Sequence, residues 1–241
     1  MYSPLLNWSN ENTTCFIERN EWNPCLNIES KYPGLQYLVS VDHLIIKNKY
    51  RWSDVIKNNS PSFVIKDENG QHLYHTRQES TFCNRFWRHK FSPFQIFIYD
   101  NSKFLVMIVK RNYQNATSHL CSSSCQEIEI QAPPGQLIGF IKPVVYNNCY
   151  WIYEISDEER NVQLRIDCFD NYCLDYGEYP VLSSSNDNEI GKIIKQKLYW
   201  TQEMLVKSKN FEVNFPIDLD IKFKALLLAA VFVINYMVYE N

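Results

Sequence analysis

The five histidines are the first side chains to consider for chemistry, because histidine is the commonest general acid or base in enzymes. They are His43, His72, His75, His89 and His119, and none of them belongs to an HExxH metal motif. The chain also has no GxSxG nucleophile turn and no glycine-rich phosphate loop. His72 and His75 are three residues apart in an expected strand, which places them on opposite faces. We therefore expect no acid–base pair, no bond-making enzyme activity and no organic cofactor.

The most basic and aromatic stretch of the chain is RFWRHK, residues 85–90. Cationic side chains bind lipid phosphates, and tryptophan prefers the boundary between water and lipid. Arg85, Trp87, Arg88 and Lys90 are therefore candidates for contact with lipid headgroups. The alternative is a solvated loop with one packed tryptophan.

Eight cysteines raise the question of disulfides or a metal site. The first residues, MYSPLLNWSNENTT, lack the basic segment and apolar run of a secretory signal, so we expect reduced thiols. Cys121 and Cys125 are four residues apart, whereas zinc sites typically use closer CxxC pairs or histidine partners. A zinc site is therefore not expected.

A run near the C-terminus, ALLLAAVFVINYMVY (residues 225–239), is apolar on every face of a helix. Ala225, Leu227, Phe232 and Tyr239 belong to it, and Asn235 is its one strongly polar side chain. Such a helix must be surrounded by protein or by lipid. It would span roughly 22 Å, which is short of the bilayer core of about 30 Å. A core helix is favoured, and a membrane span is the alternative.

Elements that read as strands precede this helix, with turn signals between them. Asn69-Gly70 predicts a hairpin between residues 62–66 and 71–75, and residues 100–102 separate strands over 94–99 and 103–110. The charged loop at Asp157, Glu158 and Glu159 reads as a solvated tip between a strand over 151–155 and one over 161–167. Further strands are expected over residues 127–131, 137–142, 189–195 and 211–215, a polar loop over 181–188 and a short helix over 199–207. This pattern predicts a mainly β fold, a closed barrel of roughly twelve strands around the C-terminal hydrophobic helix.

Length and composition fit one large domain. The chain has 241 residues, 45% of them hydrophobic, and only 6 glycines, which argues against long flexible linkers. We expect an extended or partly disordered lead over residues 1–30 and one barrel domain over residues 31–241, with its helix at 221–239. The net charge of −3 provides no general attraction for nucleic acid.

Several segments together resemble the phospholipid scramblase family. They are QEIEIQAPPG (126–135), PGLQYL (33–38), Val41-Asp42, Asn69-Gly70-Gln71, NFEVNFPIDLD (210–220) and the helical run KFKALLLAAVFVINYMVYE (222–240). The resemblance extends in order over more than 200 residues, from about residue 32 to the end. It implies a tubby-like fold, which is a barrel of about twelve strands around a C-terminal hydrophobic helix.

The resemblance also implies a location and an activity. Family members associate with the cytoplasmic face of membranes, mainly the plasma membrane, and move phospholipids between leaflets with stimulation by calcium. Some members enter the nucleus and bind DNA. The segment that matches the family's nuclear-import region keeps Lys192, Lys195 and Lys197, which are also typical of a solvated face.

The family's calcium loop corresponds to KSKNFEVNFPID, residues 207–218. The resemblance implies a carboxylate ligand at Asp218 and backbone carbonyls at Phe211, Val213 and Phe215. Two positions that are acidic in the family are Lys207 and Lys209 here, and an ammonium group has no lone pair to offer calcium. We therefore expect weak calcium binding or none, with the three apolar residues facing into the barrel.

The palmitoylated cysteine cluster of the family corresponds to LCSSSC, residues 120–125. Only Cys121 and Cys125 remain as candidates for lipidation, and two ordinary thiols on a loop are the alternative. The long proline-rich segment of longer members has no counterpart in the lead.

The sequence thus favours a divergent scramblase-like protein that acts on phospholipid membranes by bidirectional, ATP-independent lipid movement, with calcium dependence in doubt. The alternative is a tubby-like membrane-lipid-binding or regulatory module that does not scramble lipids. A nuclear location and a nucleic-acid partner are the less favoured expectations.

Overall fold

The computed structural model describes residues 31–49, 62–79, 94–111, 127–146, 150–168, 177–196 and 210–236. Within these residues a short 3-10 helix, η1 (Gln36–Leu38), precedes twelve strands, and one α-helix, α2 (Ile221–Ile234), follows them. The strands are β1 (His43–Asn48), β2 (Phe63–Lys66), β3 (His72–Glu79), β4 (Phe94–Asp100), β5 (Leu105–Arg111), β6 (Ile128–Gln131), β7 (Leu137–Tyr146), β8 (Tyr150–Ser156), β9 (Val162–Cys168), β10 (Gly177–Ser183), β11 (Glu189–Lys195) and β12 (Phe211–Asn214).

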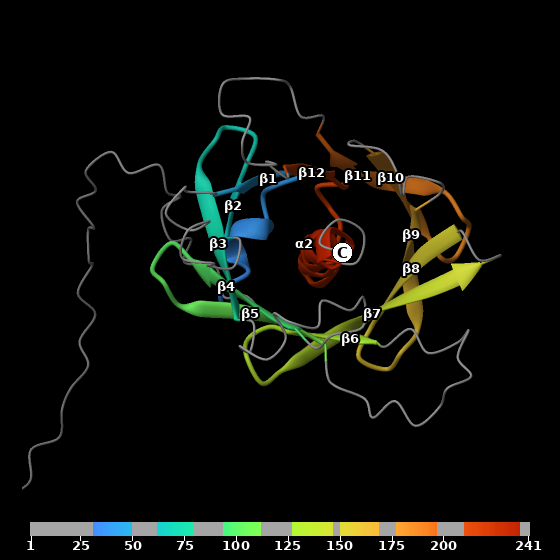
Figure 1. Cartoon of the computed structure of the whole chain (residues 1–241), viewed down its shortest axis with the longest axis horizontal. Coiled ribbons are helices and arrows are strands. Elements are labelled where there is room, and N and C mark those ends of the chain that lie inside the picture. The colour runs from blue at the N-terminus through green and yellow to red at the C-terminus, as the bar shows by residue number, and fades with distance from the viewer. Residues whose placement is uncertain are drawn as a thin grey trace, which may run out of the picture.

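The twelve strands form one closed antiparallel barrel in which chain neighbours are also sheet neighbours. β1 closes the ring on β12, with His43 opposite Asn214 and Ile46 opposite Phe211. Closure gives each strand a partner on both sides, which removes the exposed edges that favour aggregation. The prediction of a closed, mainly β barrel around a C-terminal helix is confirmed (Figure 1).

Aspartate side chains close three of the hairpins by the same chemistry. Asp67, Asp100 and Asp157 each follow or end a strand, and each carboxylate accepts the backbone N–H four residues later, at 2.8, 2.9 and 2.8 Å. Such local bonds make aspartate a turn residue. They account for the three hairpins that the sequence predicts, with ends that differ by one or two residues except at β3, which runs on to Glu79.

Because the strands alternate in direction, the barrel has two distinct ends. One end carries the turns that follow β2, β4, β6, β8 and β10, together with the loop from β12 to α2, and we call it the short-turn end. The other end is where β1, β3, β5, β7, β9 and β11 finish, and we call it the long-connection end. α2 starts at the short-turn end and runs through the barrel toward the long-connection end (Figure 1).

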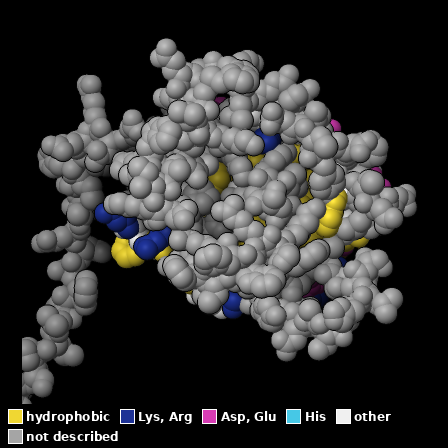
Figure 2. All heavy atoms as spheres, viewed as in Figure 1, with side chains coloured by type: hydrophobic (Ala, Val, Ile, Leu, Met, Phe, Trp, Pro, Cys, Tyr) yellow, Lys and Arg dark blue, Asp and Glu magenta, His cyan; other side chains and the backbone are white. Residues whose placement is uncertain are grey.

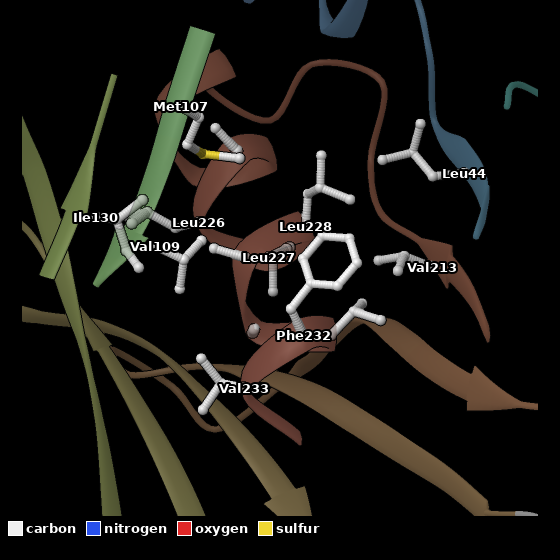
Figure 3. Close-up of a cluster of buried hydrophobic side chains, with 14 of the residues drawn as sticks. Leu44, Met107, Val109, Ile130, Val213, Leu226, Leu227, Leu228, Phe232 and Val233 are labelled. Carbon is white, nitrogen blue, oxygen red and sulfur yellow. The ribbon is translucent and has the colours of Figure 1, made fainter. Parts of the chain in front are cut away.

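α2 fills the barrel and forms the centre of the hydrophobic core. The side chains from Ala225 to Ile234 are at most 2% exposed. Figure 3 shows Leu227, Leu228 and Phe232 of α2 among side chains of several strands, including Leu44 and Val213. The helix has no polar face because the barrel surrounds it, so the structure has the core helix that the sequence favours. No helix in the described segments is long and apolar enough to cross a membrane.

One sequence expectation requires correction, and three others lie outside the described residues. The predicted polar loop over residues 181–188 is wrong in its first part, because β10 continues to Ser183 and Val181 is fully buried. The polar run that starts at Ser183, the last residue of the strand, concealed it. The short helix expected over 199–207, the lead 1–30 and Tyr239 lie outside the described residues.

Candidate functional site

A buried lysine marks the point where α2 enters the barrel. Lys224, in the first turn of α2, has no exposed surface. Its Nζ donates to four backbone carbonyl oxygens, those of Leu38 (3.1 Å), Val39 (3.3 Å), Val41 (2.7 Å) and Ile217 (2.7 Å). We call these four oxygens the ammonium cage. An ammonium group has three protons, so the four acceptors share them. The cage joins the chain before β1 to the loop between β12 and α2.

Two carboxylates at the rim act as counter-charges to the caged ammonium. Burial lowers the pKa of Lys224 from its ordinary value of 10.5, while the charges of Asp42 and Asp218 oppose that shift. Both aspartates are exposed. Asp220 instead caps the start of α2, where its side chain accepts a hydrogen bond from the backbone N–H of Lys222 at 2.7 Å.

The structure places the described part of the expected calcium loop in and after β12. Phe211 and Val213 are fully buried in a strand that is paired on both sides, with β1 and with β11. Phe215 is also buried and lies near the ammonium of Lys224, 5.4 Å from its ring centroid. These three side chains face the core, while Asp218 lies exposed in the loop before α2. Lys207 and Lys209 lie outside the described residues.

The described residues fit a calcium ion poorly. Calcium takes six to eight oxygen ligands, and the described residues of this loop bring one carboxylate, Asp218, to the entrance of α2. The carbonyl of the adjacent Ile217 is bonded to Lys224. In the described segments no three His, Cys, Asp or Glu side chains are grouped so that they could hold a metal ion.

The charged turn between β8 and β9 is more buried than the sequence suggests. Asp157 is buried, and Glu158 is half-buried and bonded to Lys222 of α2 at 2.7 Å, so only Glu159 is the exposed tip that we expected. Asp157 accepts from the backbone N–H of Glu159 and from both nitrogens of Asn161, at 2.8–3.2 Å, and from Gln163 Nε2 at 3.2 Å. The prediction of a solvated tip is wrong for Asp157 and Glu158 because their oxygens have partners within the protein.

Replacing Asp157 by alanine tests this turn. Burial alone would raise the pKa of Asp157, but the hydrogen bonds from Asn161 and Gln163 outweigh it, and the pKa is lowered from 3.8. A carboxylate whose pKa is lowered on folding stabilises the folded state above about pH 4. This stabilisation is lost as the pH falls through the lowered pKa. We expect Asp157→Ala to lose about 1–2 kcal/mol near pH 7, and less at pH 3, in chemical denaturation. An equal loss at both pH values would contradict this assignment.

The described histidines do not form an acid–base site with one another. His43 lies in β1, with Nε2 3.7 Å from a carboxylate oxygen of Glu212. His72 and His75 lie in β3, and His75 stacks on Tyr99 at 5.4 Å between ring centroids. His89 and His119 lie outside the described residues. Cys168 is the one cysteine within them, and burial raises the pKa of its thiol.

The candidates for headgroup contact and lipidation lie outside the described residues. They are Arg85, Trp87, Arg88, Lys90, Cys121 and Cys125. The flanking strands show only where the chain leaves and rejoins the barrel. β3 ends at Glu79 and β4 begins at Phe94, while β5 ends at Arg111 and β6 begins at Ile128. All four points lie at the long-connection end.

The helix candidates are core residues in the described part of α2. Ala225, Leu227 and Phe232 are buried, and Asn235 is buried directly after Ile234, where its backbone N–H bonds to the carbonyls of Val231 and Phe232. Our sequence reasoning missed Lys224. A signal was present, because a lysine at the start of a run that is otherwise apolar must find oxygen partners when it is buried.

Comparison with known proteins gives one family. The family model described as Scramblase matches residues 23–241. Phospholipid scramblase 2 of Bos taurus is 33% identical over 222 residues, covering 86% of this chain and 72% of the relative. Phospholipid scramblase 1 of Mus musculus is 30% identical over 218 residues, covering 87% of this chain and 64% of the relative. The chain thus spans slightly less than two thirds of the mouse relative's length.

Among solved structures, one of a protein from Arabidopsis thaliana is similar, with a TM-score of 0.46 and 13% sequence identity. That similarity covers 82% of this chain and 94% of the other.

Proposed function

The chain belongs to the Scramblase family, and from this membership we propose that it moves phospholipids between the leaflets of a membrane, in both directions and without ATP. The observation that carries the proposal is the family match, which covers the whole barrel and its helix, residues 23–241. Lipid movement down a gradient makes and breaks no covalent bond, so it requires none of the acid–base pairs that the sequence lacks. We place the protein on the cytoplasmic face of a membrane, in the first instance the plasma membrane.

We further propose that calcium has little effect on this chain. Lys207 and Lys209 replace acidic positions of the family loop, and the chain's own Lys224 already occupies the carbonyl oxygen of Ile217, beside Asp218. A calcium ion near this loop would meet ammonium groups that repel it and offer no lone pairs. We make no assumption that any step of lipid movement passes through a metal.

Scrambling in vesicles tests both statements. Purified chain is reconstituted into vesicles with a trace of fluorescent phospholipid, and the fraction accessible to a membrane-impermeant quencher is followed over a calcium titration. We expect this fraction to exceed that of protein-free vesicles, with less than a twofold response to calcium. Lys207→Asp/Lys209→Asp should acquire a calcium response, because it restores two carboxylate ligands.

The outcomes separate the two statements. Scrambling that rises steeply with calcium in the parent chain would contradict the ligand argument and leave the transport proposal intact. No scrambling by either protein, at any calcium concentration, would refute transport and leave membrane binding as the function of the fold.

A further inference from the structure

Four exposed cations gather on the outer side of β1 to β4. They are Lys47 in β1, Lys49 directly after it, Arg77 in β3, and Lys103 in the turn between β4 and β5, and we call them the basic wall. The strand register places Lys47, Lys49 and Arg77 near one another, and Lys103 lies on the same side of the barrel but in a turn at the short-turn end. Lys47 lies opposite Val64 of β2, and Val64 lies opposite His75. Continuing this register, the row of Lys49, Ser62 and Arg77 spans two strand spacings, or roughly 10 Å.

His75 lies in β3, in the same cross-strand row as Lys47 of the basic wall. Burial is the main cause of its lowered pKa, and the charges of Lys49 and Lys103 lower it further. Asp100, whose carboxylate also accepts the backbone N–H of Phe104, opposes this effect. The charges of Lys49 and Lys103 thus both act on this one ring.

Within the described residues, four cations elsewhere on the barrel have carboxylate partners, which the basic wall does not have. These four cations each form one ion pair. The pairs are Arg160 with Glu127 (3.2 Å), Arg165 with Asp187 (3.2 Å), Lys192 with Glu178 (3.4 Å) and Lys222 with Glu158 (2.7 Å). Among the side chains that the structure describes, no carboxylate forms an ion pair with Lys47, Lys49, Arg77 or Lys103. Adjacent cations repel one another, and among the described residues Asp100 is one acidic group beside four cations, so the cluster keeps an excess of positive charge that favours an external anion.

An exposed aromatic ring lies at the edge of the wall. Phe104, next to Lys103, is 71% exposed, more than the other large hydrophobic side chains found exposed in the described segments. Figure 2 shows Lys and Arg side chains together with hydrophobic ones at the left edge of the molecule, on the side of β3 to β5. A cation beside an apolar ring matches the boundary of an anionic bilayer, where phosphates meet acyl chains.

We propose that the basic wall, with Phe104 at its edge, is the surface on which this chain docks to an anionic phospholipid membrane. The choice of partner rests on the function proposed above. Duplex nucleic acid fits less well, because an exposed phenylalanine has no role in contacts with phosphate alone.

Flotation with vesicles tests the proposal by a matched pair of triple variants. Lys47→Gln/Lys49→Gln/Arg77→Gln removes three charges from the basic wall. Arg160→Gln/Arg165→Gln/Lys192→Gln removes three exposed charges that are ion-paired elsewhere, so the net charge changes equally. On vesicles of phosphatidylcholine with 30% phosphatidylserine, each wall charge should contribute about fivefold to binding, or roughly 100-fold for three. The control variant should lose less than threefold, and salt should weaken binding of the parent chain.

A second variant separates a membrane from other anions. Phe104→Ser should weaken binding to these vesicles by several-fold and leave binding to short duplex DNA unchanged. Equal losses in the two triple variants would show an effect of net charge alone and would overturn the proposal, as would tighter binding of the duplex than of the vesicles.

Scrambling after detergent reconstitution distinguishes this inference from the proposed function. If the basic-wall variant loses vesicle binding and the parent chain binds vesicles but does not scramble lipids, the transport function is refuted and the docking surface is supported. Scrambling by the parent chain, with unchanged vesicle binding by the wall variant, would refute the docking surface alone.

Discussion

Lys224→Met is expected to lower the free energy of unfolding by about 2–5 kcal/mol. Methionine keeps the length and apolar stem of the side chain but removes the ammonium. The four carbonyl oxygens of the ammonium cage then lose their donor, and the bonds to Leu38 and Val41 are fully buried. The loss of stability is partly offset, because folding of the variant no longer removes a charged group from water. Chemical denaturation followed by circular dichroism measures the change.

Lys222→Met is the matched control for this substitution. Lys222 lies two residues earlier in the same turn of α2, and its ion pair with Glu158 is part-exposed. Such pairs typically contribute about 1 kcal/mol or less. Equal destabilisation by the two variants would show that the ammonium cage adds nothing beyond an ordinary ion pair.

Phe232→Ala is expected to cost about 3–5 kcal/mol, the range for large-to-small changes in a core. Phe232 is 2% exposed at the centre of the barrel, and its ring meets that of Phe63 edge-on at 5.5 Å between centroids. The rigid ring of strands around it limits collapse into the space, so a cavity remains. The same denaturation experiment measures this loss.

Phe104→Ala makes the same chemical change at an exposed position. With 71% of its surface exposed, Phe104 should alter the free energy of unfolding by no more than about 0.5 kcal/mol. A loss at Phe232 as small as that at Phe104 would contradict the central position of α2.

The sequence specifies the barrel well where the determining contacts are local. Asp67, Asp100 and Asp157 each close a turn within four residues, so hairpins are readable from short segments. The apolar run of α2 likewise requires burial wherever the rest of the chain lies. β10 escaped prediction because its last residue, Ser183, begins a polar run that continues to residue 188, which made the end of the strand resemble a loop.

The part of the site that sequence reasoning missed depends on distant contacts. Lys224 bonds to the carbonyls of Leu38 and Val41, which are 186 and 183 residues away in the chain. Backbone carbonyls have no sequence signature, so no motif points to the cage. The basic wall likewise combines β1, β3 and a turn after β4, and its members are adjacent only once the strand register is known. The resemblance to a family shows the fold and leaves such local chemistry unspecified.

The central claim is that α2 stays enclosed in a closed barrel when the protein is on a membrane. Hydrogen exchange of the full chain, with and without anionic vesicles, tests it most directly. We expect the amides of β1 and β12, which close the ring, and those of α2 to remain protected to the same degree in both states. Faster exchange in β1 and β12 on vesicles, with α2 still protected, would show that the barrel opens and releases its helix into lipid, and would contradict the claim.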